Sequence, residues 1–180
     1  MVRCPKYTKY KRVNITACLF FALCIVGAAT SARAQDNDNK ERAAALYNEA
    51  AALFHEGNTD KAIETVRESL KADASSAIAY DQLGYMLLSK RRHQEALSAF
   101  DEALKLNPKM RTSRTGKGLA LLGTGDVNEA EAVLKEALQL NPNPSMTYYA
   151  LGLAYERSNE YKKAIEQYKE GIRSFREGKP

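Results

Sequence analysis

The chain has 180 residues, a formal net charge of +5 and a sequence pI near 9.0, a balance that would ordinarily favour an anionic partner. The excess charge is confined to residues 1–34, which hold six basic residues and no acidic one, whereas residues 35–180 hold 21 basic and 22 acidic residues. The composition of the larger part therefore argues against a nucleic-acid-binding protein.

Residues 1–34 have the order of a secretory signal peptide. A basic segment precedes an apolar run at residues 17–29, and an Ala32-Arg33-Ala34 step follows. An apolar run of this length is short for a membrane span. We therefore expect cleavage near Ala34 and a periplasmic or secreted protein, with an uncleaved N-terminal membrane anchor as the alternative. All three cysteines lie in this leader, so the mature chain would have no disulfide and no thiol nucleophile.

A short polar segment, residues 35–42, separates the leader from a repeat of 34 residues. Residues 95–108, EALSAFDEALKLNP, and residues 129–142, EAEAVLKEALQLNP, are identical at eight of fourteen positions. The frame extends to four units, residues 43–76, 77–110, 111–144 and 145–178. A small residue recurs at the eighth position of each unit: Ala50, Gly84, Gly118 and Gly152. We expect these residues to let two helices approach closely.

Each unit is predicted to be a pair of antiparallel helices. Apolar residues recur at three- and four-residue steps, which indicates amphipathic helices and an all-α chain. A turn signal divides each unit, at Gly57-Asn58, Arg91-Arg92, Gly125-Asp126 and Asn159-Glu160. Pro108 and Pro142 stand where a helix has to stop. Arg91 occupies a place that glycine or asparagine holds in the other units, so we expect backbone strain there.

The second unit resembles the tetratricopeptide repeat (TPR) pattern, through Tyr80, Leu83, Gly84, Leu87, Ala96, Phe100, Ala103 and Pro108. The first unit departs most, with Glu49 and Ala50 in place of the Leu-Gly pair. The resemblance covers about three quarters of the chain. It implies a solenoid of four helix-turn-helix repeats with a right-handed superhelical twist, in which the first helices of the units line a concave groove that binds peptides.

The groove positions that this resemblance assigns are mostly apolar or aromatic. The lysine and asparagine that clamp a peptide carboxylate in some family members are replaced here by Tyr47 and Ala51 in one unit, and by Asp81 and Tyr85 in the next. We therefore predict a partner segment carrying apolar side chains. The predicted partner-binding residues are Tyr47, Asn48, Asp81, Tyr85, Thr115, Leu119, Tyr149 and Leu153.

A second candidate surface is a basic stripe on the first helix of the third unit. Arg111, Arg114 and Lys117 are spaced by three residues, so they share one side of a helix. This stripe favours an alternative function, the binding of an anionic envelope polymer or lipid.

The sequence displays no catalytic group, metal-ligand cluster or cofactor motif. The TGKG stretch at residues 115–118 lacks the earlier glycine of a phosphate-binding loop. We therefore expect a non-enzymatic adaptor or scaffold of the cell envelope that binds a protein or peptide partner, alternatively an accessory factor of pilus or secretion assembly. The last helix has apolar residues that a further repeat would cover, which raises the hypothesis of a homodimer through this end: Ile165, Tyr168, Ile172 and Phe175.

Overall fold

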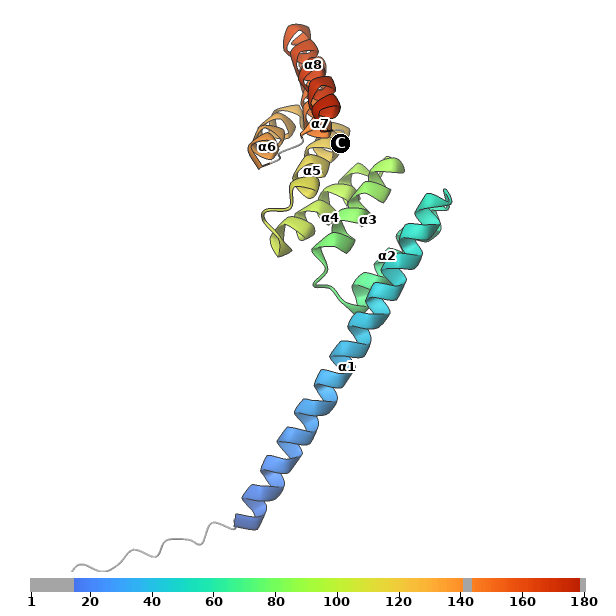
Figure 1. The fold of residues 1–180 in the computed structure, drawn as a ribbon, viewed down its shortest axis with the longest axis vertical. Helices are drawn as coiled ribbons and strands as arrows, with labels where there is room; N and C mark the ends of the chain where they lie inside the picture. The colour runs from blue at the N-terminus through green and yellow to red at the C-terminus, as the bar shows by residue number, and fades with distance from the viewer. Residues whose placement is uncertain (1–14, 141–143, 179–180) are drawn as a thin grey trace, which may run out of the picture. The chain divides into compact units, whose positions relative to one another are not determined.

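The computed structural model describes residues 15–140 and 144–178, with side chains from residue 35 onward. These residues form eight helices and no strand, as the apolar periodicity predicts (Figure 1). The helices are α1 (Ile15–His55), α2 (Thr59–Ala72), α3 (Ala77–Ser89), α4 (His93–Leu106), α5 (Arg111–Thr124), α6 (Val127–Leu140), α7 (Ser145–Arg157) and α8 (Tyr161–Glu177).

The chain divides into two compact units, Met1–Asn39 and Lys40–Pro180. The boundary falls inside α1. Residues 35–42, which the sequence indicates only as a polar segment, belong to this helix. Residues 1–14 lie outside the described part, as do the side chains of the rest of the leader. Among the described residues no helix is both long and apolar enough to cross a membrane.

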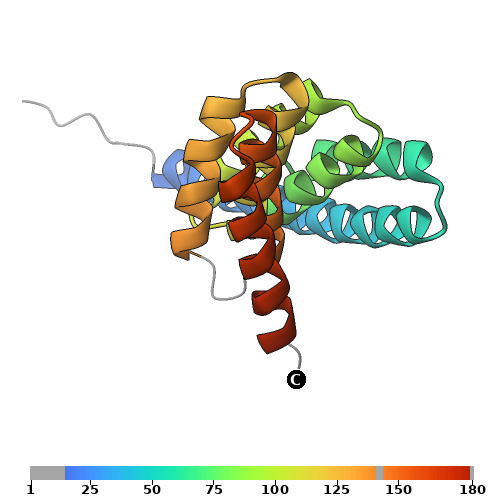
Figure 2. The same ribbon diagram turned by 90° about the horizontal axis from the view of Figure 1, so that it is seen from above.

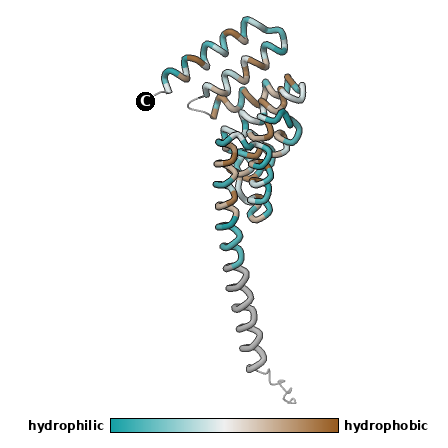
Figure 3. Tube along the Cα trace, turned by 90° about the vertical axis from the view of Figure 1, so that its right-hand side faces the viewer, coloured by the Kyte–Doolittle hydropathy of each residue, from teal (hydrophilic) through white to brown (hydrophobic). Residues whose placement is uncertain are grey.

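The second unit is an array of helix pairs in which each helix from α2 to α7 packs against the next one (Figure 2). The first helices of neighbouring pairs also meet, α3 with α5 and α5 with α7. Along the coloured helices in Figure 3, polar and apolar residues follow one another at short intervals, as amphipathic helices require. The apolar side chains gather in two buried clusters, one around Phe100 and one around Leu134.

The four predicted turns share one backbone geometry. Gly57, Arg91, Gly125 and Asn159 all have positive φ, at +84°, +58°, +99° and +61°. In every turn the next residue donates its N–H to a carbonyl five positions earlier, as in Arg92 to Leu87 at 2.9 Å and Glu160 to Tyr155 at 2.8 Å. This is the Schellman arrangement that ends a helix with a left-handed residue. Arg91 thus has the left-handed backbone that the sequence predicts, a conformation that a side chain with a β-carbon disfavours.

The small residues of the eighth position permit the close crossing within each pair. A β-carbon on Gly84 would lie 2.5 Å from the Phe100 ring, and one on Gly118 would lie 2.5 Å from Leu134. Both pairs are separated by sixteen residues, as are Gly152 and Tyr168. In the first pair the equivalent residues are Ala50 and Val66, both fully buried. Only the first unit has a β-carbon at the eighth position, and there the facing residue is a valine, which is smaller than the phenylalanine, leucine or tyrosine of the other units.

The interval between repeats is also as predicted where it is described. The helix α4 ends at Leu106, and Pro108 lies in the connection that follows. Pro142 lies outside the described residues.

Candidate functional site: the first helices and the terminal cleft

The eight predicted partner-binding residues all lie on the first helices of the pairs, α1, α3, α5 and α7. They differ in how open they are. Asn48 and Tyr149 are exposed, and Asp81 and Thr115 are buried. The half-buried members are Tyr47, Tyr85, Leu119 and Leu153.

Asp81 is buried because it joins α3 to α5. Its Oδ1 accepts a hydrogen bond from Ser113 Oγ at 2.6 Å, and its Oδ2 accepts one from Thr112 Oγ1 at 3.0 Å. Burial raises the pKa of Asp81, while the bonds from the Ser113 and Thr112 hydroxyls act in the opposite direction.

Thr115 joins α5 to α7 in the same way, through a 2.8 Å hydrogen bond between its hydroxyl and that of Thr147. The Thr115 side chain is therefore enclosed between two repeats. The groove pattern instead predicts that it faces an open surface. Asp81 and Thr115 are both the fifth residue of a unit, and each meets the third residue of the next unit, 32 positions later. The spacing of 32 residues could have predicted this contact from the sequence, but only if the alignment of neighbouring first helices had been known.

Two tyrosines lie within electrostatic reach of Asp81. Tyr85 donates its hydroxyl to the Thr112 carbonyl at 2.8 Å, and its ring meets Phe100 edge-on with centroids 5.2 Å apart. Burial, followed by the negative charge of Asp81, raises the pKa of Tyr85. The same two causes, in the same order, raise the pKa of Tyr47. Asp81 and Tyr85 are therefore joined through Thr112.

An open, mostly apolar cleft lies at the end of the array, between α7 and α8. This terminal cleft has a volume of about 810 Å³. Of the predicted partner-binding residues, Tyr149 lines it. The lining residues are Ser145, Met146, Tyr149, Tyr168, Gly171, Ile172, Phe175 and Arg176.

The terminal cleft has aromatic and aliphatic walls. The rings of Tyr149 and Tyr168 are 5.8 Å apart, and the Tyr168 hydroxyl donates to Glu156 at 2.8 Å. Burial and this carboxylate raise the pKa of Tyr168 to about 12, so Tyr168 remains a neutral donor at physiological pH. Ile172 and Phe175 are exposed, as the sequence predicts for the last helix.

The exposure of α8 contrasts with that of α2, its equivalent in the first pair. Ile165 and Ile172 are 52% and 57% exposed, whereas the residues at the same places in α2, Ile63 and Leu70, are 1% and 8% exposed. The difference has a simple cause, since α3 packs against α2. The terminal cleft is thus the surface that a following helix covers elsewhere in the array.

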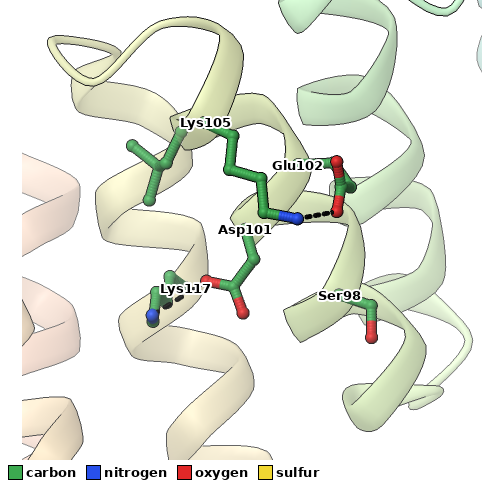
Figure 4. Close-up of a pocket in the computed structure, with 6 residues that line it drawn as sticks. Ser98, Asp101, Glu102, Lys105 and Lys117 are labelled. Atoms are coloured by element: carbon green, nitrogen blue, oxygen red, sulfur yellow. Dashed lines mark hydrogen bonds and ion pairs between the residues drawn. The ribbon is translucent and has the colours of Figure 1, made fainter.

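The predicted basic stripe is not a continuous free cationic surface. The Arg114 side chain is 17% exposed, with Nη2 donating to the Pro108 carbonyl at 2.8 Å and Nε 3.8 Å from Glu136. Lys117 is 22% exposed, and its Nζ lies 2.8 Å from Asp101. Figure 4 shows Lys117 directed at Asp101, beside a second pair formed by Lys105 and Glu102. Acidic residues of the neighbouring second helices therefore neutralise two of the three cations, and of the three only Arg111 is exposed.

No group of three or more histidine, cysteine, aspartate or glutamate side chains in the described part of the chain is placed to hold a metal ion. His93 is packed beside Gly123, where a β-carbon would lie 2.2 Å from Nδ1. Its ring fills space between α4 and α5.

The helix pairs, the 34-residue period and the small-against-large crossings define a repeat family. The sequence pattern described as Tetratricopeptide repeat matches residues 26–77, 66–111, 82–145 and 115–178. The chain belongs to the tetratricopeptide repeat family. TPR domains mediate protein–protein interactions, and the fold is generally a scaffold without enzymatic activity.

Solved TPR structures share this fold. A crystal structure of MamA superposes with a TM-score of 0.67 at 23% identity, covering 81% of this chain and 86% of that chain. The Arabidopsis OM64 TPR domain gives 0.63 at 20% identity, over 66% of this chain and 98% of that one. The second TPR domain of human RPAP3, solved in complex with the HSP70 peptide SGPTIEEVD, gives 0.60 at 20% identity, over 66% and 97%. No curated protein sequence matches the chain.

Proposed function

We propose that this TPR protein is a non-enzymatic adaptor of the cell envelope that holds an amphipathic helix of a partner protein. The observation that carries the proposal is the terminal cleft between α7 and α8, with its exposed aromatic and aliphatic walls. Exposed apolar surface of this kind, next to a charged rim, is typical of protein-binding sites.

The array itself indicates what kind of element fits the cleft. The same surface of α2 is covered by helix α3, and those of α4 and α6 are covered by α5 and α7. A helix with an apolar face would therefore bury Ile172 and Phe175 as α3 buries Leu70. Met146 and Tyr149 belong to α7, so the bound helix would also touch the end of the predicted concave surface.

The rim of the cleft adds a preference for charge. Arg176 lines the cleft and forms no ion pair with any described residue. We therefore expect the partner helix to carry an acidic residue that meets this guanidinium at the edge of the apolar contact.

The location in the envelope rests on the leader, residues 1–34, with its basic segment, apolar run and Ala32-Arg33-Ala34 step. Mass spectrometry of the protein from the periplasmic fraction should give a mature N-terminus at Gln35. An intact N-terminus in the membrane fraction would instead establish the anchored form.

Photocrosslinking in the cell tests the proposed docking. A benzoylphenylalanine at Met146 should give one discrete adduct whose partner peptide is an amphipathic helix. The adduct should disappear with Ile172→Glu. Ile78→Glu is the matched control, because Ile78 is equally exposed but lies on α3, away from the cleft.

Two results would contradict this assignment. An adduct of twice the chain mass would give the cleft to a second copy, the homodimer that the last helix raised as a hypothesis. Light scattering over a range of protein concentrations would then show the mass of two chains. The absence of any adduct, or one that survives Ile172→Glu, would remove the cleft as a docking site.

A further inference from the structure

We propose that Asp81, joined to Tyr85 through Thr112, forms a subsite on the first helices for a cationic side chain, a lysine or arginine of a bound peptide. This subsite lies on α3 and α5 and is independent of the terminal cleft, so either can fail without the other.

The first observation is a buried charge without a counter-charge. Asp81 is 6% exposed, and none of its contacts in the described structure is an ion pair. Its two hydrogen-bond partners are neutral hydroxyls, on Thr112 and Ser113. Buried carboxylates in proteins are generally paired with a cation, because two neutral hydrogen bonds recover only part of the lost hydration energy.

The second observation is that the contact between α3 and α5 does not require a charge. One repeat later, Thr115 makes the equivalent contact with Thr147 through two neutral hydroxyls, in a site that is also buried. Two neutral side chains therefore suffice to join neighbouring first helices in this array. The carboxylate at residue 81 carries a desolvation cost that this joint alone does not explain.

The third observation is the direction of the two carboxylate oxygens. Oδ1 faces inward, to the fully buried Ser113, whereas Oδ2 bonds to Thr112, which is exposed on α5. A carboxylate oxygen has two lone-pair directions, so Oδ2 can accept a further donor beside Thr112.

The fourth observation is the aromatic ring of Tyr85. Its hydroxyl donates to the carbonyl of Thr112, and the hydroxyl of Thr112 donates to Asp81. The charge of Asp81 also adds to the rise in the pKa of Tyr85 and of Tyr47. Aromatic faces attract ammonium and guanidinium groups, and they pack against the aliphatic stems of lysine and arginine. A carboxylate with a tyrosine ring nearby therefore suits a long basic side chain better than a small inorganic cation.

Asp81 is also the one formally charged residue among the eight predicted partner-binding residues. A bound segment would thus find one place for a positive charge, which fixes its register along the helices.

The probe that tests this inference is a pair of capped tripeptides, acetyl-Ala-Arg-Ala-amide and its citrulline analogue, which has nearly the same shape without the charge. Titration of the ¹⁵N-labelled protein, purified as it accumulates in the cell, should shift the amides of Tyr47, Asp81, Tyr85 and Ser113 with the arginine peptide. The citrulline peptide should bind at least tenfold more weakly.

Two variants separate charge from structure. Asp81→Asn keeps the shape and Asp81→Thr reproduces the neighbouring Thr115 joint, and both should lose at least tenfold in affinity for the arginine peptide. Circular dichroism would confirm that at least one remains folded. Glu136→Gln, the loss of an exposed acid, should bind as the wild type does. Equal binding of the two peptides, unchanged binding by a folded variant, or shifts confined to other helices would overturn the subsite.

Discussion

The eighth residue of the second repeat, Gly84, lies against the ring of Phe100, and the space between them has no room for a methyl group. A β-carbon at residue 84 would be 2.5 Å from the nearest ring atom. Gly84→Ala should therefore destabilise the protein by about 1–3 kcal/mol, the usual range for overpacking a core. Urea denaturation followed by circular dichroism would measure the loss.

The same pair permits a double-mutant cycle. The first repeat has Ala50 and Val66 at these two places, so Gly84→Ala/Phe100→Val should be less destabilised than the sum of the single variants. Gly171→Ala is the comparison, because its added carbon would come no nearer than 3.3 Å to a neighbour, against 2.5 Å at residue 84, so its cost should be smaller. Strict additivity of the Gly84 and Phe100 effects would contradict the contact.

Arg91 holds a left-handed backbone that glycine adopts without strain. With φ at +58° and the side chain exposed, Arg91→Gly should raise the free energy of unfolding by about 0.5–1 kcal/mol, since relief of strain exceeds the extra backbone entropy of glycine. The change would appear as a higher urea midpoint with the same m-value.

Asn159→Gly is the matched comparison for Arg91→Gly. Asn159 has φ of +61°, but asparagine tolerates this region better than arginine does. Asn159→Gly should therefore raise the free energy of unfolding by less than Arg91→Gly does. A larger gain at residue 159 than at residue 91 would show that strain is not what limits the second turn.

The buried hydroxyl pair between α5 and α7 should respond asymmetrically to mutation. Thr115→Val leaves the Thr147 hydroxyl buried without its partner, and should cost about 1–3 kcal/mol. The double variant Thr115→Val/Thr147→Val removes both polar groups and should recover most of that loss. Thermal and urea unfolding of the four proteins would give the coupling energy, and a double variant worse than the single one would contradict the assignment.

Asp81 should make stability fall as pH rises. Because burial raises its pKa in the folded protein, Asp81 keeps its proton to a higher pH when folded than when unfolded, where its pKa is about 3.9. Its contribution therefore favours folding below that unfolded value and is lost as pH rises through the folded pKa. The stability of Asp81→Asn, measured relative to wild type between pH 3.5 and 7, should improve with pH. A difference that is constant or has the opposite slope would contradict a raised pKa.

The parts of this fold that repeat are the parts that the sequence predicts well. The four turns and the crossings at Gly84, Gly118 and Gly152 each involve residues of one unit only, and the same residue types recur from unit to unit. The contacts between units are harder, because they depend on how neighbouring helices are aligned. Asp81 meets Ser113 for that reason, although the groove pattern predicts an open position.

The basic stripe shows the same limit in another form. Arg114 and Lys117 share one side of α5, as their spacing indicates. The acids that face them, Glu136 and Asp101, come from second helices on either side of α5. No spacing rule within one helix predicts that the stripe is neutralised.

The two buried clusters also bear on how the array comes apart. Leu97 packs against both of them and is the side chain that joins the interior around Phe100 to the interior around Leu134. A solenoid linked in this way unfolds in stages when the ends are unequally stabilised. A helix bound in the terminal cleft would stabilise the cluster around Leu134 more than the cluster around Phe100. Binding should therefore make thermal unfolding less cooperative.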